Sequence, residues 1–82
     1  MRDPYEAKAA VYRHETAVAA SCQDAAVAFE RDGASTEART AWSAALAAAR
    51  LARDASPHAY GQRVMARHIE WLEWRLSSCV NS

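Results

Sequence analysis

Hydrophobic positions recur along this chain every three or four residues, which is the period of an α-helix, and nowhere alternate as they do in a β-strand. The segment before Gly33 opens with Asp3, Pro4 and Glu6, which can cap and start a helix. We therefore expect a first helix over residues 4–32. One of its faces carries Val11, Val18, Cys22, Ala25 and Phe29, and a neighbouring row carries Tyr5, Tyr12, Ala19 and Ala26.

Two further helices follow from the breaks in this pattern. Gly33 suits the left-handed conformation that ends a helix, and Ser35 or Thr36 can cap a second helix over residues 36–54. Ser56 and Pro57 repeat the start signal and predict a third helix over residues 57–79. The face of the second helix holds Ala38, Trp42, Ala45, Leu46 and Ala49, and the main stripe of the third holds Met65, Ile69, Leu72, Leu76 and Cys79.

These patterns predict one all-α domain over residues 1–82, built from a helical hairpin and a third, C-terminal helix. The predicted core consists of Phe29, Trp42, Leu46, Ile69, Leu72 and Leu76.

The third helix carries more large apolar side chains than one stripe accounts for. Tyr60, Val64 and Trp71 form a second stripe about 120° from the first, and Trp74 points nearly opposite the first. One interpretation places this helix between the other two, with both stripes in the core. The other interpretation is that part of this helix faces another protein chain, either a second copy or a foreign partner, because aromatic residues and arginine dominate interface hot spots. The residues that would face it are Tyr60, Arg67, Trp71 and Trp74. The candidate partner-binding residues are Tyr60, Arg63, Val64, Arg67, Trp71, Trp74 and Arg75.

Composition narrows the classes of partner. The 82 residues are 51% hydrophobic with a formal net charge of zero, which does not favour direct binding to nucleic acid. Residues 1–37 hold four basic and seven acidic side chains, whereas residues 38–82 hold six and three, an asymmetry that could orient a second copy or another partner. We expect a homodimer at micromolar concentration. The chain lacks the apolar run of a membrane span or signal peptide, so we expect a cytoplasmic protein with reduced cysteines.

No catalytic arrangement is recognisable in the sequence. The three histidines have no metal-ligand spacing, and there is no glycine-rich phosphate loop. We expect His68 to be a hydrogen-bonded residue at the core edge, and Glu70 and Glu73 to lie on a solvated face with Arg63 and Arg67. An arginine from a later helix should match Glu15. Cys22 and Cys79 should not form a disulfide, because the first and third helices would run parallel. We therefore predict a non-enzymatic protein with no metal and no cofactor.

Two segments resemble known families. Residues 25–46 resemble a tetratricopeptide-type hairpin, with small, aromatic and turn residues at Ala26, Phe29, Gly33, Ala38, Trp42, Ala45 and Leu46. The chain also resembles the ANR family (AraC negative regulators), small bacterial regulators with two tryptophan segments. The first is matched by Glu30, Gly33, Ala38, Trp42 and Ala45, and the second by Glu70, Trp71, Arg75 and Cys79. Ala34 and Ser35 replace the family's aromatic after the glycine, His68 replaces an asparagine, and the link between the segments is longer.

The ANR resemblance implies a negative regulator that binds an AraC/XylS-type transcription activator and is linked to virulence regulation. In that case the third helix would supply the contact. A different class is a phage-encoded inhibitor of a bacterial defence or host system, of the anti-CRISPR type. An enzyme with an unrecognised site is the third alternative.

Overall fold

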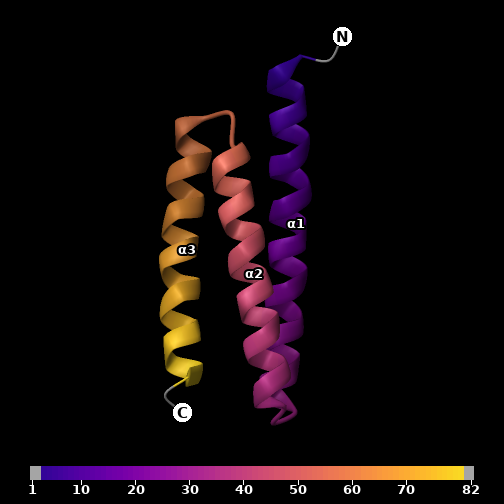
Figure 1. Ribbon diagram of the computed structural model, residues 1–82, viewed down its shortest axis with the longest axis vertical. Helices are drawn as coiled ribbons and strands as arrows, with labels where there is room; N and C mark the ends of the chain where they lie inside the picture. Colours follow the sequence, from indigo (N-terminus) through magenta and orange to yellow (C-terminus); the bar gives the residue numbers. More distant parts are fainter. Residues whose placement is uncertain (1–2, 81–82) are drawn as a thin grey trace.

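The computed structural model describes residues 3–80, with side chains described as far as residue 78, so the position predicted for Cys79 lies outside it. Its elements are three α-helices: α1 Pro4–Arg31, α2 Ser35–Ala55 and α3 Ala59–Val80. They run down, up and down, so α1 and α3 are parallel (Figure 1). The all-α prediction is confirmed, and each helix boundary falls within two residues of the one predicted.

The helix ends follow the local sequence only in part. Asp3 caps α1, since its Oδ1 accepts a hydrogen bond from the Tyr5 amide at 3.1 Å. Gly33 has a φ of 77°, the left-handed conformation expected after a helix. The predicted caps of α2 are wrong: Ala34 is the N-cap, and no side chain caps this helix. Pro57 likewise lies in the turn before α3 and not in its first turn.

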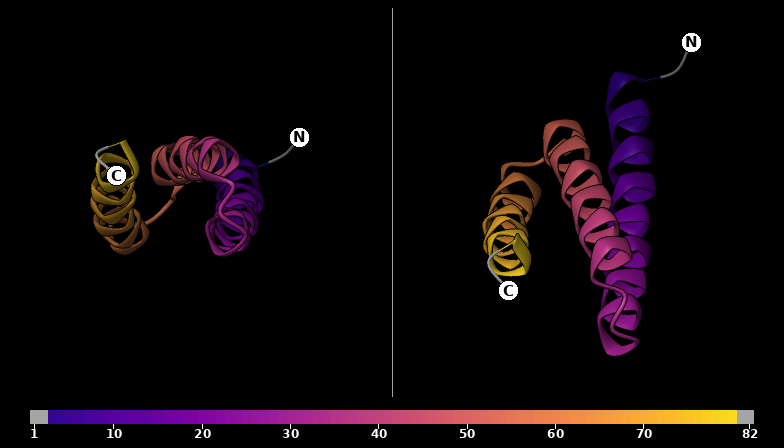
Figure 2. Two further views of the ribbon diagram at one scale, coloured as in Figure 1. Left: turned by 90° about the horizontal axis from the view of Figure 1, so that it is seen from below. Right: turned by 60° about the horizontal axis from the view of Figure 1, so that its bottom comes forward.

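The three helices form an open layer with α2 in the middle. Among the described residues, α2 packs against both α1 and α3, while α1 and α3 do not pack against each other. Seen along the helices, the three axes form a shallow U (Figure 2, left). The molecule measures 48 × 20 × 12 Å. The interpretation in which the third helix lies between the other two is therefore wrong.

The core is centred on α2 and is rich in alanine, because small side chains allow helices to approach closely. Of the predicted core, Trp42, Leu46, Ile69 and Leu72 are buried, and Leu76 is partly buried against them. The remaining buried hydrophobic residues are Ala19, Ala26, Ala38, Ala45, Ala48, Ala49, Ala52 and Met65.

The prediction for Phe29 is wrong, since this residue remains 37% exposed. Only α2 covers α1, and it covers the row that contains Ala19 and Ala26. Val11 and Phe29 belong to the neighbouring row and are exposed. A single neighbouring helix buries one narrow stripe, so the larger side chains of α1 stay at the edge of the contact.

Candidate functional site

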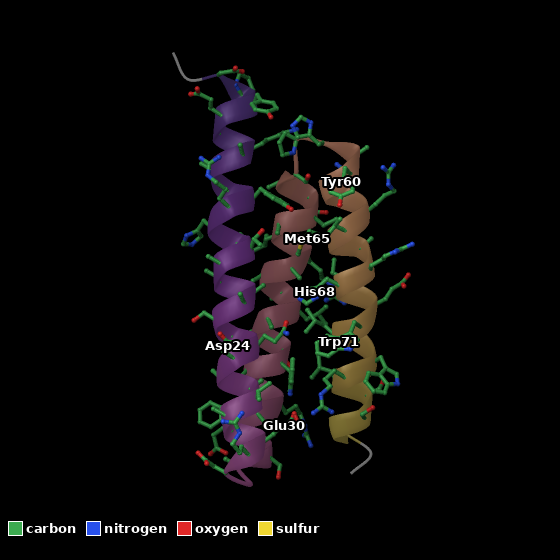
Figure 3. All side chains as sticks on the ribbon, turned by 180° about the vertical axis from the view of Figure 1, so that it is seen from behind. Asp24, Glu30, Tyr60, Met65, His68 and Trp71 are labelled. Atoms are coloured by element: carbon green, nitrogen blue, oxygen red, sulfur yellow. The ribbon has the colours of Figure 1, made fainter. Side chains whose placement is uncertain are left out.

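A groove lies between α1 and α3 on the concave side of the layer. It contains a hollow of about 310 Å³. The two flanking helices supply its walls, and the buried Ala19 and Met65 close its floor above α2. Figure 3 views this face and shows Asp24 on α1 opposite His68 and Trp71 on α3. The residues that line the hollow are Thr16, Ala19, Ala20, Gln23, Asp24, Val64, Met65 and His68.

A polar and aromatic cluster closes the lower end of the groove. Arg75 of α3 forms an ion pair with Glu30 of α1, and its guanidinium lies 5.3 Å from the centre of the Trp42 ring. The Trp42 indole N–H donates a hydrogen bond to Glu30 Oε1 at 3.1 Å. All three helices thus meet through one carboxylate. Charge-assisted bonds of this kind hold side chains in defined orientations.

This cluster also positions Trp71. Its ring packs edge-to-face on Trp42, with centroids 5.6 Å apart and planes at 72°. The His68 ring stacks on Trp71 as well, with centroids 6.0 Å apart and planes at 12°. Trp71 nevertheless remains 41% exposed. A large aromatic side chain held by neighbours and open to solvent loses little further entropy on binding a partner.

Near the upper end of the groove, a second link joins α1 to the turn before α3. The Tyr5 hydroxyl lies 2.6 Å from His58 Nε2, within hydrogen-bond distance. Below it is a hollow of about 350 Å³ whose lining includes Tyr5, Tyr12 and Tyr60. The groove is therefore bridged near both ends by side chains and open along its middle.

The structure divides the predicted partner-binding residues into two groups. Val64 lines the groove, Tyr60 lines the upper hollow, and Trp71 and Arg75 belong to the lower cluster. Arg63, Arg67 and Trp74 lie outside these linings and are exposed, and Arg63 contributes to a separate hollow between α2 and α3. Tyr60 and Trp74 are the most exposed large hydrophobics, at 71% and 61%.

Sequence reasoning missed the α1 side of the groove. Glu30 entered only through the family resemblance, and Asp24 was not singled out. Both lie on the groove side of α1, and Glu30 provides the link to α3 (Figure 3). The neighbouring Thr16, Ala20 and Gln23 are small or polar, so no hydrophobic periodicity marks this wall. It is recognisable only when α1 and α3 are placed beside each other.

Several polar contacts differ from those predicted. Glu15 forms no ion pair with an arginine among the described residues, and its Oε1 lies 3.9 Å from His14 Nε2. Glu73 pairs with Arg50 of α2 at 3.4 Å and not with an arginine on its own helix. His68 stacks on Trp71, and no hydrogen bond of its side chain is found within residues 3–78.

The described residues contain no group of three or more His, Cys, Asp and Glu side chains placed to hold a metal ion. Within residues 3–80, every helix is too short or too polar to span a bilayer.

We compared the chain with models of known families, with curated proteins and with solved structures, and none of them matches it.

Proposed function

We propose that this protein acts by binding another protein through α3 and the adjoining groove. The observation that supports the proposal is the concentration of exposed aromatic side chains on one helix. Tyr60, Trp71 and Trp74 are all exposed although the domain has a core in which Trp42 and Leu72 are fully buried. Monomeric proteins rarely expose large contiguous apolar surfaces without an interaction to cover them.

The exposed area of these aromatic side chains is a substantial part of one side of an interface. An aromatic side chain covers on the order of 150–250 Å², so the exposed fractions of these three residues amount to roughly 250–450 Å². A standard interface buries about 800 Å² on each partner. Three side chains on α3 would therefore supply a third to a half of one side.

The proposed target is an AraC/XylS-type transcription activator, inhibited when the helical protein covers its dimerisation or DNA-binding surface. This target follows from the ANR resemblance. Four residues from the two resembling segments, Glu30, Trp42, Trp71 and Arg75, meet in the lower cluster. Their meeting supports the view that the two segments form one unit that presents Trp71.

The second candidate function is inhibition of a bacterial defence or host system by a phage-encoded protein. It requires the same features, namely a small helical scaffold and an exposed aromatic surface. The two candidates differ in the protein that is bound.

Affinity capture from the native host, followed by a reporter assay, tests the proposal. Recovery of an AraC-type activator, together with repression of a promoter that depends on it, supports the first candidate. Recovery of a nuclease or surveillance complex supports the second. The Trp74→Ala variant should lower partner binding at least tenfold with an unchanged melting temperature, because Trp74 is an exposed residue.

Leu51→Ala is the matched control, since Leu51 is equally apolar and 54% exposed but lies on α2 outside the groove lining. Equal loss of binding in both variants would contradict the assignment of the surface to α3. Full binding by a folded Trp71→Ala/Trp74→Ala variant would contradict it as well.

A further inference from the structure

We infer that the groove between α1 and α3 is filled by α3 of a second copy of this chain, giving a two-fold dimer in which each third helix lies in the groove of the other. This inference stands independently of the proposed function, because it needs only the surfaces of this chain. A foreign partner would have to compete with the second copy for the same helix.

The shape of the groove suits one helix. The flanking helices α1 and α3 do not pack against each other, so a further helix can lie over α2 between them, against the side chains that bridge the groove near its two ends. Figure 2 (left) shows that the three helix axes form a U whose open side lies away from α2. The two copies are related by a two-fold axis that runs parallel to the helices beside α3. This axis places α3 of the second copy in the groove between α1 and α3 of the first. The same operation places α3 of the first copy in the groove of the second, as an isologous interface requires.

In this dimer, two sides of α3 that are exposed in the monomer are in contact with the second copy. The side of α3 that faces its own groove, with Val64 and Trp71, meets the same side of the second α3 near the axis. The outward side, with Arg67 and Trp74 seven residues apart, meets the α1 wall of the other copy. The dimer therefore covers the aromatic side chains that a monomer leaves in water.

The charges of the two surfaces match. Asp24 lies on the α1 wall, and Arg67 lies on the outward side of α3. Both are exposed, and neither forms an ion pair within residues 3–78. Figure 3 shows Asp24 at the level of Trp71 along the groove, and Arg67 precedes Trp71 by about one turn. The axis keeps these levels in register because the two copies run parallel. An arginine side chain spans one turn, so Arg67 of the second copy reaches Asp24.

A charge exchange tests this pairing with the protein itself as the probe. Sedimentation equilibrium should show a dimer of the unaltered chain at micromolar concentration. Asp24→Arg places two arginines together at each contact, and Arg67→Glu places two carboxylates together. Each variant alone should have a dimer dissociation constant at least tenfold higher. An equimolar mixture should recover the original affinity, because both contacts of the mixed dimer then join opposite charges.

Monomeric wild-type protein at high concentration would overturn the inference and leave the groove to a foreign helix. Failure of the mixture to recover affinity, with both variants folded by circular dichroism, would overturn it too.

A second pair of variants tests the groove without relying on Asp24. Ala20 is an exposed residue of the groove wall, and Ala47 is an exposed residue of α2 outside the lining. Ala20→Glu should prevent dimerisation, whereas Ala47→Glu should not change it. Equal effects of the two substitutions would contradict the groove as the interface.

Discussion

Position 61, in the first turn of α3, should need a glycine because Ser56 leaves no room for a side chain there. The backbone conformation of the helix does not itself require glycine. The φ of Gly61 lies outside the left-handed range. A Cβ added at this position would lie 2.3 Å from Ser56 Oγ and 3.5 Å from the Tyr12 hydroxyl oxygen. The first distance is too short for any real contact. Ser56 must therefore move when Gly61 is replaced by alanine.

The cost of that movement follows from the hydrogen bonds of Ser56. This residue is only 4% exposed, and its hydroxyl donates to the His58 carbonyl oxygen at 2.9 Å. Loss of a buried hydrogen bond that leaves a partner unsatisfied costs about 1–3 kcal/mol. Alanine gains up to about 1 kcal/mol over glycine in a helix. Gly61→Ala should therefore lower the free energy of unfolding, by up to about 2 kcal/mol.

The sign should reverse when Ser56 is already alanine. The nearest Ser56 atom is then its Cβ, 3.4 Å from the added methyl group and in ordinary contact. In the Ser56→Ala background, Gly61→Ala should raise the free energy of unfolding by up to about 1 kcal/mol. Urea unfolding of the four proteins gives the coupling directly, and 1 kcal/mol corresponds to about 4–8 °C in melting temperature. Additive effects of the two substitutions would refute the contact.

Three other substitutions test the core and the lower cluster. Trp42→Ala should lower the free energy of unfolding by about 3–5 kcal/mol, because Trp42 is 1% exposed and central to the core; an unchanged melting temperature would contradict the helix assignment. Phe29→Ala should cost clearly less in the same assay, since Phe29 lies at the edge of the α1–α2 contact. Glu30→Gln removes the charge that pairs with Arg75 and should increase amide hydrogen exchange in the last turns of α3 more than in α2. Equal exchange in both helices would show that this ion pair does not hold α3.

The sequence determined the helices, because the signals that start and stop them are local. Asp3 and Gly33 act over a few residues at the two ends of α1, and the three- and four-residue spacing of apolar side chains needs no partner to be recognised. The same spacing identified Trp42 and Leu72 as core, since each lies in the middle of an apolar stripe. The two stripes of α3 also showed that this helix carries more hydrophobic surface than one neighbour covers.

Only the tertiary structure decided which stripe each helix buries. Val11 and Phe29 form an apolar row as regular as that of Ala19 and Ala26, yet α2 approaches closest where the side chains are smallest. The open arrangement of α1 and α3 likewise depends on packing against α2, which no periodicity along a single helix records. The ion pair of Glu30 with Arg75 joins residues 45 positions apart, and it forms because the parallel course of α1 and α3 places them at the same end of the layer. The spacing of apolar residues identifies the apolar faces of each helix. Which of these faces is buried against a neighbour depends on how all three helices pack together.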